Sequence, residues 1–435
     1  MKKTIGVLLT FLLIVLILSL LINWSLFKKK SSNKGGSVSM MAVGGGAELD
    51  ALNAMCKDFE AKNGIKVELE TTRDLDAVLT TRVEAGNPPD IVALPGPGLM
   101  ISLGKAGKLV DLKKMLDMGQ IRKDYAQGWL DLGTVDNKQF GLFYKAATKG
   151  LFWYNPKALK AIGIDKTPDT WDEMMKDARM IIDKGKTPFA VGVESGAASG
   201  WVGTDWIENI FVRLHGPKKY KEWQDGKLAW TSPEVKEAWE YFGQVVANEK
   251  MVYGGKQYVL STGFGDAHAP LFSNPPKAYF HQQASFIQSF IQKAFPDLKP
   301  GEDFNFFGFP SINPKYAKAV ESAGDVLVAF NDTPQAKAFL NYLASVEAQT
   351  YWAKIGNLVP NRNVPLTAFP DELTKNAAEI LSKAEIVVFD AGDMMPSDVN
   401  NAFFSSVVSY IQDPGKLDSI LENLDKIRKD AFSKM

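Results

Sequence analysis

Strand and helix patterns alternate along residues 38–94, and this alternation limits the fold more than any other feature of the sequence. Residues 38–44 read as a short strand, and 48–62 place their apolar side chains on one face of a helix. Residues 65–71 alternate as a second strand, 75–85 form a second helix, and the apolar run ending at residue 94 indicates a buried third strand. Strand, helix and strand of this length form a right-handed crossover with parallel strands. The sequence therefore predicts an α/β fold, in which ligands bind beyond the carboxyl ends of the strands.

Helical patterns continue through the rest of the chain, and no internal repeat is found. Helices are predicted at about 156–162, 170–184, 205–214, 233–248, 334–355, 371–384 and 416–432. Residues 38–435 are 398 residues, more than one hydrophobic core usually supports. Two or three domains are therefore expected.

Residues 5–27 form an uncharged apolar run. As a helix at about 1.5 Å per residue they would reach roughly 35 Å, enough to span the core of a bilayer. A cleavable signal peptide has a shorter apolar region and a small-residue cleavage site, and neither is clear here. We expect an N-terminal transmembrane helix, with a removable signal as the alternative; residues 28–37 complete a 1–37 segment as a flexible tether. Lysines on both sides of the span leave its orientation open.

Charge and rare residue types exclude several classes of function. The chain has 50 Lys and Arg against 50 Asp and Glu, but six Lys and no acid fall in residues 1–37, which leaves −6 for residues 38–435. Such a body lacks the basic surface that nucleic acids require, so no nucleic acid is expected as a partner. The single Cys56 excludes an intrachain disulfide, and three His outside any metal motif predict no metal site and no cofactor. Two carboxylates for glycoside hydrolysis could still come from any of the 50 acids.

Four segments carry a resemblance to a known family. NPPDIVALPGPGLMISLGKAGKLVDL (87–112), GLFYKAATKGLFWYNPKALKAIGI (141–164), TPDTWDEM (167–174) and FLNYLASVEAQTYWAKIGNLVPNRNV (339–364) follow one another in the family's order. The sequence thereby resembles the extracellular solute-binding proteins of carbohydrate ABC transporters, the family that includes maltose-binding protein. Two further stretches, SGWVGTDWIENI (199–210) and FDAGDMMP (389–396), resemble a subgroup associated with α-glucosides.

The resemblance implies a two-lobed, periplasmic-binding-protein-like α/β fold in which the chain crosses between lobes three times. The crossings fall near Thr148 and Lys149, near Gly324 and around Val364, each read as a junction between a strand-like and a helix-like segment. Lobe I then comprises 38–148 with 325–363, and lobe II comprises 149–324 with 364–435. The ligand cleft is expected between the lobes.

The function that the resemblance implies is capture of an oligosaccharide outside the cell membrane and its delivery to the permease subunits of an ABC importer. The body would lie on the extracytoplasmic face, anchored through residues 5–27 or released after signal cleavage. No enzymatic activity is expected. An anchored carbohydrate-active enzyme and a receptor for a non-sugar solute stay as alternatives.

Sugars present apolar C–H faces and hydroxyls, so their sites combine aromatic rings with planar polar groups. In lobe II the expected ligand residues are Glu194, Trp201, Asp205, Trp206, Gln283, Phe286, Asp393 and Phe404. Asp205 also fits a helix capping box, with Trp206 in the core, and these alternatives stay open. Glu194 fits a solvated strand end, and Phe286 fits the core equally well.

In lobe I the expected ligand residues are Gly46, Glu48, Arg73 and Pro97. Gly46 and Glu48 belong to the turn between strand and helix, where free backbone N–H groups can meet an oxygen. Pro97 belongs to the loop after the buried strand. Arg73 follows the second strand, and an exposed ion pair is its alternative.

Overall fold

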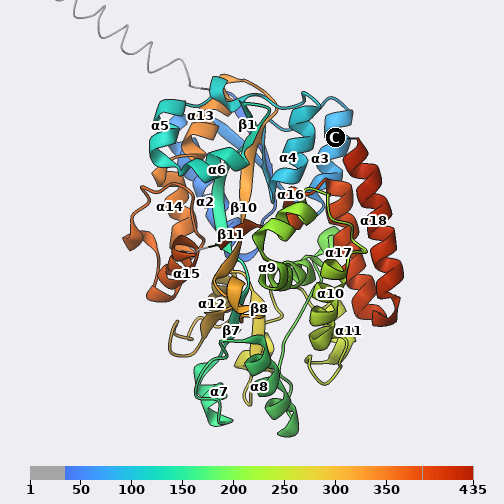
Figure 1. Cartoon of the computed structure of the whole chain (residues 1–435). Coiled ribbons are helices and arrows are strands. Elements are labelled where there is room, and N and C mark those ends of the chain that lie inside the picture. Colours follow the sequence, from blue (N-terminus) through green and yellow to red (C-terminus); the bar gives the residue numbers. More distant parts are fainter. Residues whose placement is uncertain (1–34, 385, 435) are drawn as a thin grey trace, which may run out of the picture.

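The computed structural model describes residues 35–384 and 386–434. Its larger sheet has six strands in the order β11-β10-β3-β1-β2, with β6 paired to β10 (Figure 1). Their bounds are β1 Ser37–Ala42, β2 Lys66–Thr71, β3 Ile91–Leu94, β6 Leu142–Thr148, β10 Ala319–Ala329 and β11 Ile386–Phe389. β1 is parallel to β2 and β3, which confirms the crossover unit expected from the sequence.

The helices that pack with this sheet come from both the beginning and the later part of the chain. They are α2 Gly46–Asn63, α3 Leu75–Glu84, α4 Pro97–Lys105, α13 Pro334–Leu343 and α14 Val346–Lys354. One apolar cluster joins β1, α2 and α13, and it contains Phe59, Phe339 and Trp352. A second cluster includes Leu79, Met100 and Phe143. Residues about 300 positions apart therefore share one core.

A smaller sheet and a second group of helices form the other part of the molecule. The sheet has the order β8-β7-β9, with bounds β7 Leu151–Tyr154, β8 Phe280–Gln283 and β9 Asn305–Gly308. Its largest core cluster draws on residues between 152 and 319 and between 388 and 431. The helices around this core are α8 Trp171–Asp183, α9 Trp201–Gln224, α10 Pro233–Val246, α17 Ser397–Gln412 and α18 Leu417–Ser433.

Shorter elements connect these parts. They are α5 Met118–Asp124, α6 Gln127–Leu132, β4 Thr134–Val135, β5 Lys138–Gln139, α7 Pro156–Ala161, α11 Gly255–Ser261, α12 Ile287–Ala294, α15 Glu372–Lys383 and α16 Ala391–Met394. In Figure 1 the larger sheet occupies the upper part of the view, and β7, β8, α7 and α8 lie in the lower part.

Several predicted elements are confirmed and several are corrected. The predicted helix at 334–355 is two helices, because Ser345 caps a new helix at Val346. The helix predicted from 205 begins at Trp201, since Gly200 takes a φ of 110° just before it. The first residues of α4 fall in a stretch that the sequence suggested was a loop, and α17 was not predicted.

The crossing predicted at Gly324 is not a junction between a strand and a helix. Gly324 lies in the middle of the eleven-residue strand β10, opposite Ala146 of β6. A Cβ at this glycine would lie 2.6 Å from the backbone oxygen of Lys145, so the residue type serves the close approach of two strands. β11, which the prediction assigns to lobe II, pairs with β10 in the larger sheet, and the division into lobes with its boundaries stays a prediction.

The membrane segment expected at residues 5–27 lies outside the described residues, as does most of the 1–37 segment. Within residues 35–384 and 386–434, none of the helices has the length and apolarity needed to cross a bilayer.

Candidate functional site

A cavity of about 670 Å³ lies where segments of the two parts of the molecule meet. This volume falls within the range of roughly 300–1,000 Å³ that is typical of small-molecule sites. Its lining residues are Gly45, Gly46, Arg73, Glu194, Ser195, Gly196, Gly263, Phe264, Gly265, Asp266, Phe290, Lys293 and Ala294. The first three belong to the larger-sheet part, and the others follow β7 in the chain.

Contacts across the cavity hold the two sides close together. Asp50 on α2 forms an ion pair of 3.2 Å with Lys293 on α12. The backbone N–H of Ala197 donates to a carboxylate oxygen of Asp74 at 3.3 Å. Gly46 takes a φ of 56°, and a Cβ at this position would lie 3.2 Å from the Phe290 ring. Gly46 is therefore favoured both by its backbone conformation and by the ring that faces it.

The charges around the cavity are balanced. Arg73 and Lys293 supply two cations, and Glu194 and Asp266 supply two carboxylates. Burial lowers the pKa of the Arg73 guanidinium, and the carboxylates of Glu48, Asp325 and Glu194 partly offset that effect. Planar donors, acceptors and two aromatic rings surround one space, which suits an uncharged ligand with many hydroxyl groups.

Three of the twelve predicted ligand residues line this cavity: Gly46, Arg73 and Glu194. Trp201 and Phe286 lie one layer behind it. The centroid of the Trp201 ring lies 5.1 Å from that of Phe264. The centroid of the Phe286 ring lies 6.1 Å from that of Trp201. They support the cavity wall in this conformation and do not line it.

Trp206 lies in the hydrophobic core, which corrects the expectation that it contacts ligand. Its side chain is fully buried, with its ring packed edge-on against Phe152 and Trp171. The capping-box alternative for Asp205 is also wrong, because α9 begins at Trp201 and places Asp205 in its second turn.

The other predicted residues are engaged elsewhere. Glu48 accepts from Lys145 and from the amide of Asn357, both at 3.0 Å. Gln283 is fully buried in β8, and its side-chain oxygen accepts from the backbone N–H of Ala284.

Pro97, Asp393 and Phe404 belong to α4, α16 and α17, away from the cavity lining. Asp393 instead borders a narrow space of about 20 Å³ at the seam between α4 and α16.

The sequence did not single out Phe264, Asp266, Phe290 and Lys293, although all four line the cavity. The signal that could have found the first two is the stretch Gly263 to Asp266, an aromatic residue between two glycines followed by an acid. Glycines there leave the ring without neighbouring side chains on its own loop, a feature typical of a binding loop.

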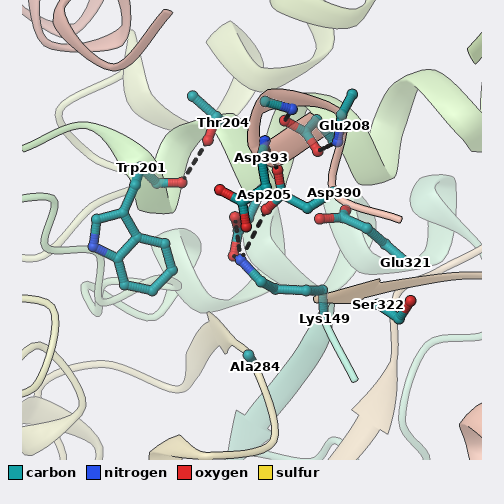
Figure 2. Close-up of polar contacts among 12 residues, drawn as sticks. Lys149, Trp201, Thr204, Asp205, Glu208, Ala284, Glu321, Ser322, Asp390 and Asp393 are labelled. Carbon is teal, nitrogen blue, oxygen red and sulfur yellow. Dashed lines mark hydrogen bonds and ion pairs between the residues drawn. The ribbon is translucent and has the colours of Figure 1, made fainter. Parts of the chain in front are cut away.

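A buried cluster of charged side chains lies where three chain segments meet helix α9 (Figure 2). The Lys149 ammonium lies 2.7 Å and 2.8 Å from the two carboxylate oxygens of Asp205 and 3.1 Å from Asp390. The backbone N–H of Lys149 donates to the backbone oxygen of Glu321. We call Lys149, Asp205, Glu208, Glu321, Asp390 and Asp393 the Lys149 cluster.

Carboxylates outnumber cations in the Lys149 cluster, and burial changes their titration. Burial raises the pKa of Asp205 to about 7, against the opposing effect of Lys149. Burial and the neighbouring carboxylates also raise the pKa of Glu208, Glu321 and Asp393 well above their usual range.

Glu208 has the fullest set of partners in the Lys149 cluster. It accepts hydrogen bonds from the backbone N–H groups of Ala391 and Gly392 and from the Tyr220 hydroxyl. These donors, together with Lys149, compensate the burial of the acids.

Three carboxylates of the cluster could in principle hold a cation. Asp205, Glu321 and Asp390 each offer an oxygen within 4.8 Å of the others. The Lys149 ammonium already bonds to two of these three groups. The cluster therefore has its own cation, supplied by the chain.

The substitution Glu321→Gln is expected to stabilise the protein at pH 8 and to have little effect at pH 5. A raised native pKa means that the contribution of Glu321 to stability is complete below its unfolded value of 4.5 and is lost as the pH rises toward the native value. Gln imitates the protonated acid and can still accept from Asn209, which bonds to Glu321 here. Each pKa unit corresponds to about 1.4 kcal/mol, so a gain of at least about 1 kcal/mol at pH 8 is expected from urea unfolding.

Several charged and polar groups face Glu321, so its surroundings differ from those of an exposed acid. They are Asn209, Asp205, Glu208, Arg213 and Tyr220 of α9, together with Lys149 and Asp390. The matched control is Glu302→Gln, because Glu302 is exposed and pairs only loosely with Lys299 at 3.8 Å. A gain for Glu321→Gln of equal size at pH 5 and pH 8 would contradict the raised pKa of Glu321 in the native protein.

Comparisons with known proteins show the family of this chain. Residues 45–350 match the family described as bacterial extracellular solute-binding protein. The chain is 40% identical over 376 residues to the osmoprotective compounds-binding protein GgtB of Synechocystis, covering 86% of this chain and 88% of that protein. It is 32% identical over 404 residues to the alpha-glucosides-binding periplasmic protein AglE of Rhizobium meliloti, covering 89% of this chain and 87% of that protein.

The fold also has solved counterparts. A chitin oligosaccharide binding protein superposes with a TM-score of 0.80 at 22% identity, over 92% of this chain and all of that one. Together with the extent of the family match, these findings confirm the resemblance seen in the sequence. The chain belongs to the bacterial extracellular solute-binding proteins, the substrate-binding components of ABC transporters.

Proposed function

We propose that this protein captures a small α-glucoside, or an osmoprotectant of similar size and polarity, and delivers it to the permease of an ABC importer. The observation that carries the proposal is the cavity of about 670 Å³, in which two cations, two carboxylates and two aromatic rings surround one space. The names of the relatives GgtB and AglE support these two ligand classes.

The proposed ligand has about two sugar rings. The cavity is of ordinary size for a small molecule. The Asp50–Lys293 ion pair and the contact between Gly46 and Phe290 limit its extension between the two sides. A disaccharide-sized ligand fits this space better than the longer oligosaccharides that the resemblance also allows.

Binding is proposed to close two lobes, 38–148 with 325–363 and 149–324 with 364–435. A ligand that contacts both lobes favours the closed arrangement, because only that arrangement makes all of its contacts. The cavity supports this proposal, since Arg73 lies in the first lobe and Glu194, Phe264 and Lys293 lie in the second.

The protein is proposed to work on the extracytoplasmic face of the membrane, held by residues 5–27 or released after signal cleavage. The family's extracellular role supports this location. N-terminal sequencing of protein from its native membrane distinguishes the two forms. A start near residues 37–42 means that the apolar run was a signal.

An anchored carbohydrate-active enzyme is not favoured, because the matched relatives with assigned roles are binding proteins. A non-sugar osmoprotectant is the second candidate, and the name of GgtB supports it. Calorimetry against sucrose, trehalose, maltose, methyl α-D-glucopyranoside and glycine betaine separates the candidates. Binding of glycine betaine alone would contradict the sugar assignment, and the release of glucose from any of these sugars would contradict a purely binding role.

The substitution Arg73→Ala is expected to weaken binding of the best sugar in that panel by roughly 10- to 100-fold. The guanidinium borders the cavity and is partly buried, so it offers charge-assisted hydrogen bonds of about 1.5–3 kcal/mol to ligand hydroxyls. Titration calorimetry measures the change.

The control for Arg73→Ala is Arg82→Ala. Arg82 is on α3, pairs with Glu70 at 2.7 Å and does not line the cavity. The Arg82→Ala variant should bind the sugar as tightly as the unchanged protein does. Equal losses in both variants would mean that Arg73 acts through general stability or net charge.

A further inference from the structure

Four side chains form a continuous column from the Lys149 cluster to the cavity. The Lys149 ammonium lies 4.9 Å from the centroid of the Trp201 ring. The Trp201 and Phe264 rings are 5.1 Å apart at an interplanar angle of 65°. The Arg73 guanidinium carbon lies 4.9 Å from the centroid of Phe264. Cation, ring, ring and cation thus follow one another, each at a distance typical of an attractive contact.

One end of this column is fixed by the Lys149 cluster. Asp205 and Asp390 hold the Lys149 ammonium from two different elements, α9 and the segment after β11. Trp201 begins α9, so its backbone is fixed by the same helix that carries Asp205. Figure 2 shows Trp201 and Asp205 on this helix, with the end of the Lys149 side chain at the Asp205 carboxylate.

The other end of the column reaches the cavity. Phe264 and Arg73 line the cavity, whereas Trp201 and Lys149 do not. Gly263 and Gly265 flank Phe264 and provide no side chains of their own to hold its ring. The ring is held instead by its neighbours, among which are Trp201 and Phe290.

We propose that Trp201, held in place by Lys149, is a positioning residue that fixes the Phe264 ring as a wall of the binding cavity. Through Phe264 it also fixes the surface on which Arg73 rests from the opposite lobe. Trp201 thus acts on ligand affinity without contacting the ligand. This inference rests on the proposed sugar-binding function and adds to it the route by which the buried charges affect the site.

A double-mutant cycle tests the route. The variants are Trp201→Leu, Phe264→Leu and the combination, with affinity measured by calorimetry for sucrose, trehalose and maltose. Trp201→Leu is expected to weaken binding roughly 3- to 10-fold, the effect of losing one aromatic pair. Phe264→Leu should weaken it by about 10-fold or more. Because both changes act on the same wall, the double variant should match Phe264→Leu within about 2-fold.

Conservative replacement separates positioning from general stability. Trp201→Phe keeps a ring against Lys149 and Phe264, so it should retain most of the affinity. The proposal is overturned if the two fold-changes multiply in the double variant, which would mean direct contact of Trp201 with the sugar. It is also overturned if Trp201→Leu binds all three sugars as the unchanged protein does.

A second measurement needs no sugar. Hydrogen exchange of residues 262–267 in the unliganded protein should be faster in Trp201→Leu and nearly unchanged in Trp201→Phe, since the loop loses a packing partner only in the first variant. Unchanged exchange in Trp201→Leu overturns the positioning role whether or not a sugar binds. Faster exchange in a protein that binds none of the three sugars supports the positioning role and overturns the proposed ligand class alone.

Discussion

Replacing Lys149 by Met is expected to lower the free energy of unfolding by about 3–5 kcal/mol. Met keeps the length of the side chain but removes the only ammonium that bonds to Asp205 and Asp390 among the described contacts. Both acids are almost fully buried, so neither can recover its loss by contact with water. Removing one partner of a buried pair costs more than the pair itself contributes, because the remaining acids stay buried without the cation that compensates them. Urea unfolding at pH 7 measures the change.

Two further variants test whether the loss of stability comes from the buried ion pairs of Lys149. Lys157→Met removes an ion pair with Asp303, but the Lys157 side chain is 70% exposed, so little change is expected. Adding Asp205→Leu to Lys149→Met removes one buried acid and should recover part of the loss, since apolar groups replace buried ion pairs at small cost. A loss no larger for Lys149→Met than for Lys157→Met would mean that the cluster is hydrated and that its carboxylates do not depend on Lys149.

The α/β architecture could be predicted because its signals are local. Hydrophobic periodicity placed β1, α2 and β2 within a few residues, and the start of α8 carries a capping box between Thr170 and Glu173. Such signals act within a few residues of chain. They do not reveal which segments meet in space.

The parts of the site that escaped prediction depend on contacts between distant residues. Lys149 and Asp390 are 241 positions apart, and no local pattern relates them. The stretch around Asp205 and Trp206 contains the residue types of a sugar site, yet the turn of α9 directs them into a buried ion pair and the core. Residue type indicated a sugar site in this stretch, but α9 contributes no residue to the lining of the described cavity.

The position of Phe264 in the cavity wall also depends on residues that are distant in the sequence. Phe264 lies between two glycines in a segment without periodicity, so its sequence context indicates a loop but not the residues that its ring contacts. Its place in the cavity follows from Trp201 and Arg73, which come from helix α9 and from the end of β2. Only the assembled fold shows these contacts.

Gly98→Ala is expected to weaken binding of the best-bound sugar by roughly 10- to 100-fold without lowering the melting temperature of the unliganded protein. A Cβ at Gly98 on α4 would lie 2.1 Å from the backbone oxygen of Met395, which follows α16 in the other proposed lobe. Overpacking of this kind costs about 1–3 kcal/mol, and here the cost falls on the closed arrangement. Titration calorimetry and a thermal scan of the same samples measure the two quantities.

Helix propensity makes this prediction distinctive, because Ala in place of Gly inside a helix ordinarily stabilises by about 1 kcal/mol. Gly128→Ala in α6 is the matched control, since a Cβ at Gly128 meets no atom within 4 Å. It should gain stability and bind as the unchanged protein does. Gly98→Ala should instead show a smaller decrease in radius of gyration by X-ray scattering when sugar is added. If Gly98→Ala binds sugar and compacts as the unchanged protein does, the contact between α4 and Met395 is not formed on closure. The two segments then belong to one rigid unit, which contradicts the proposed lobes.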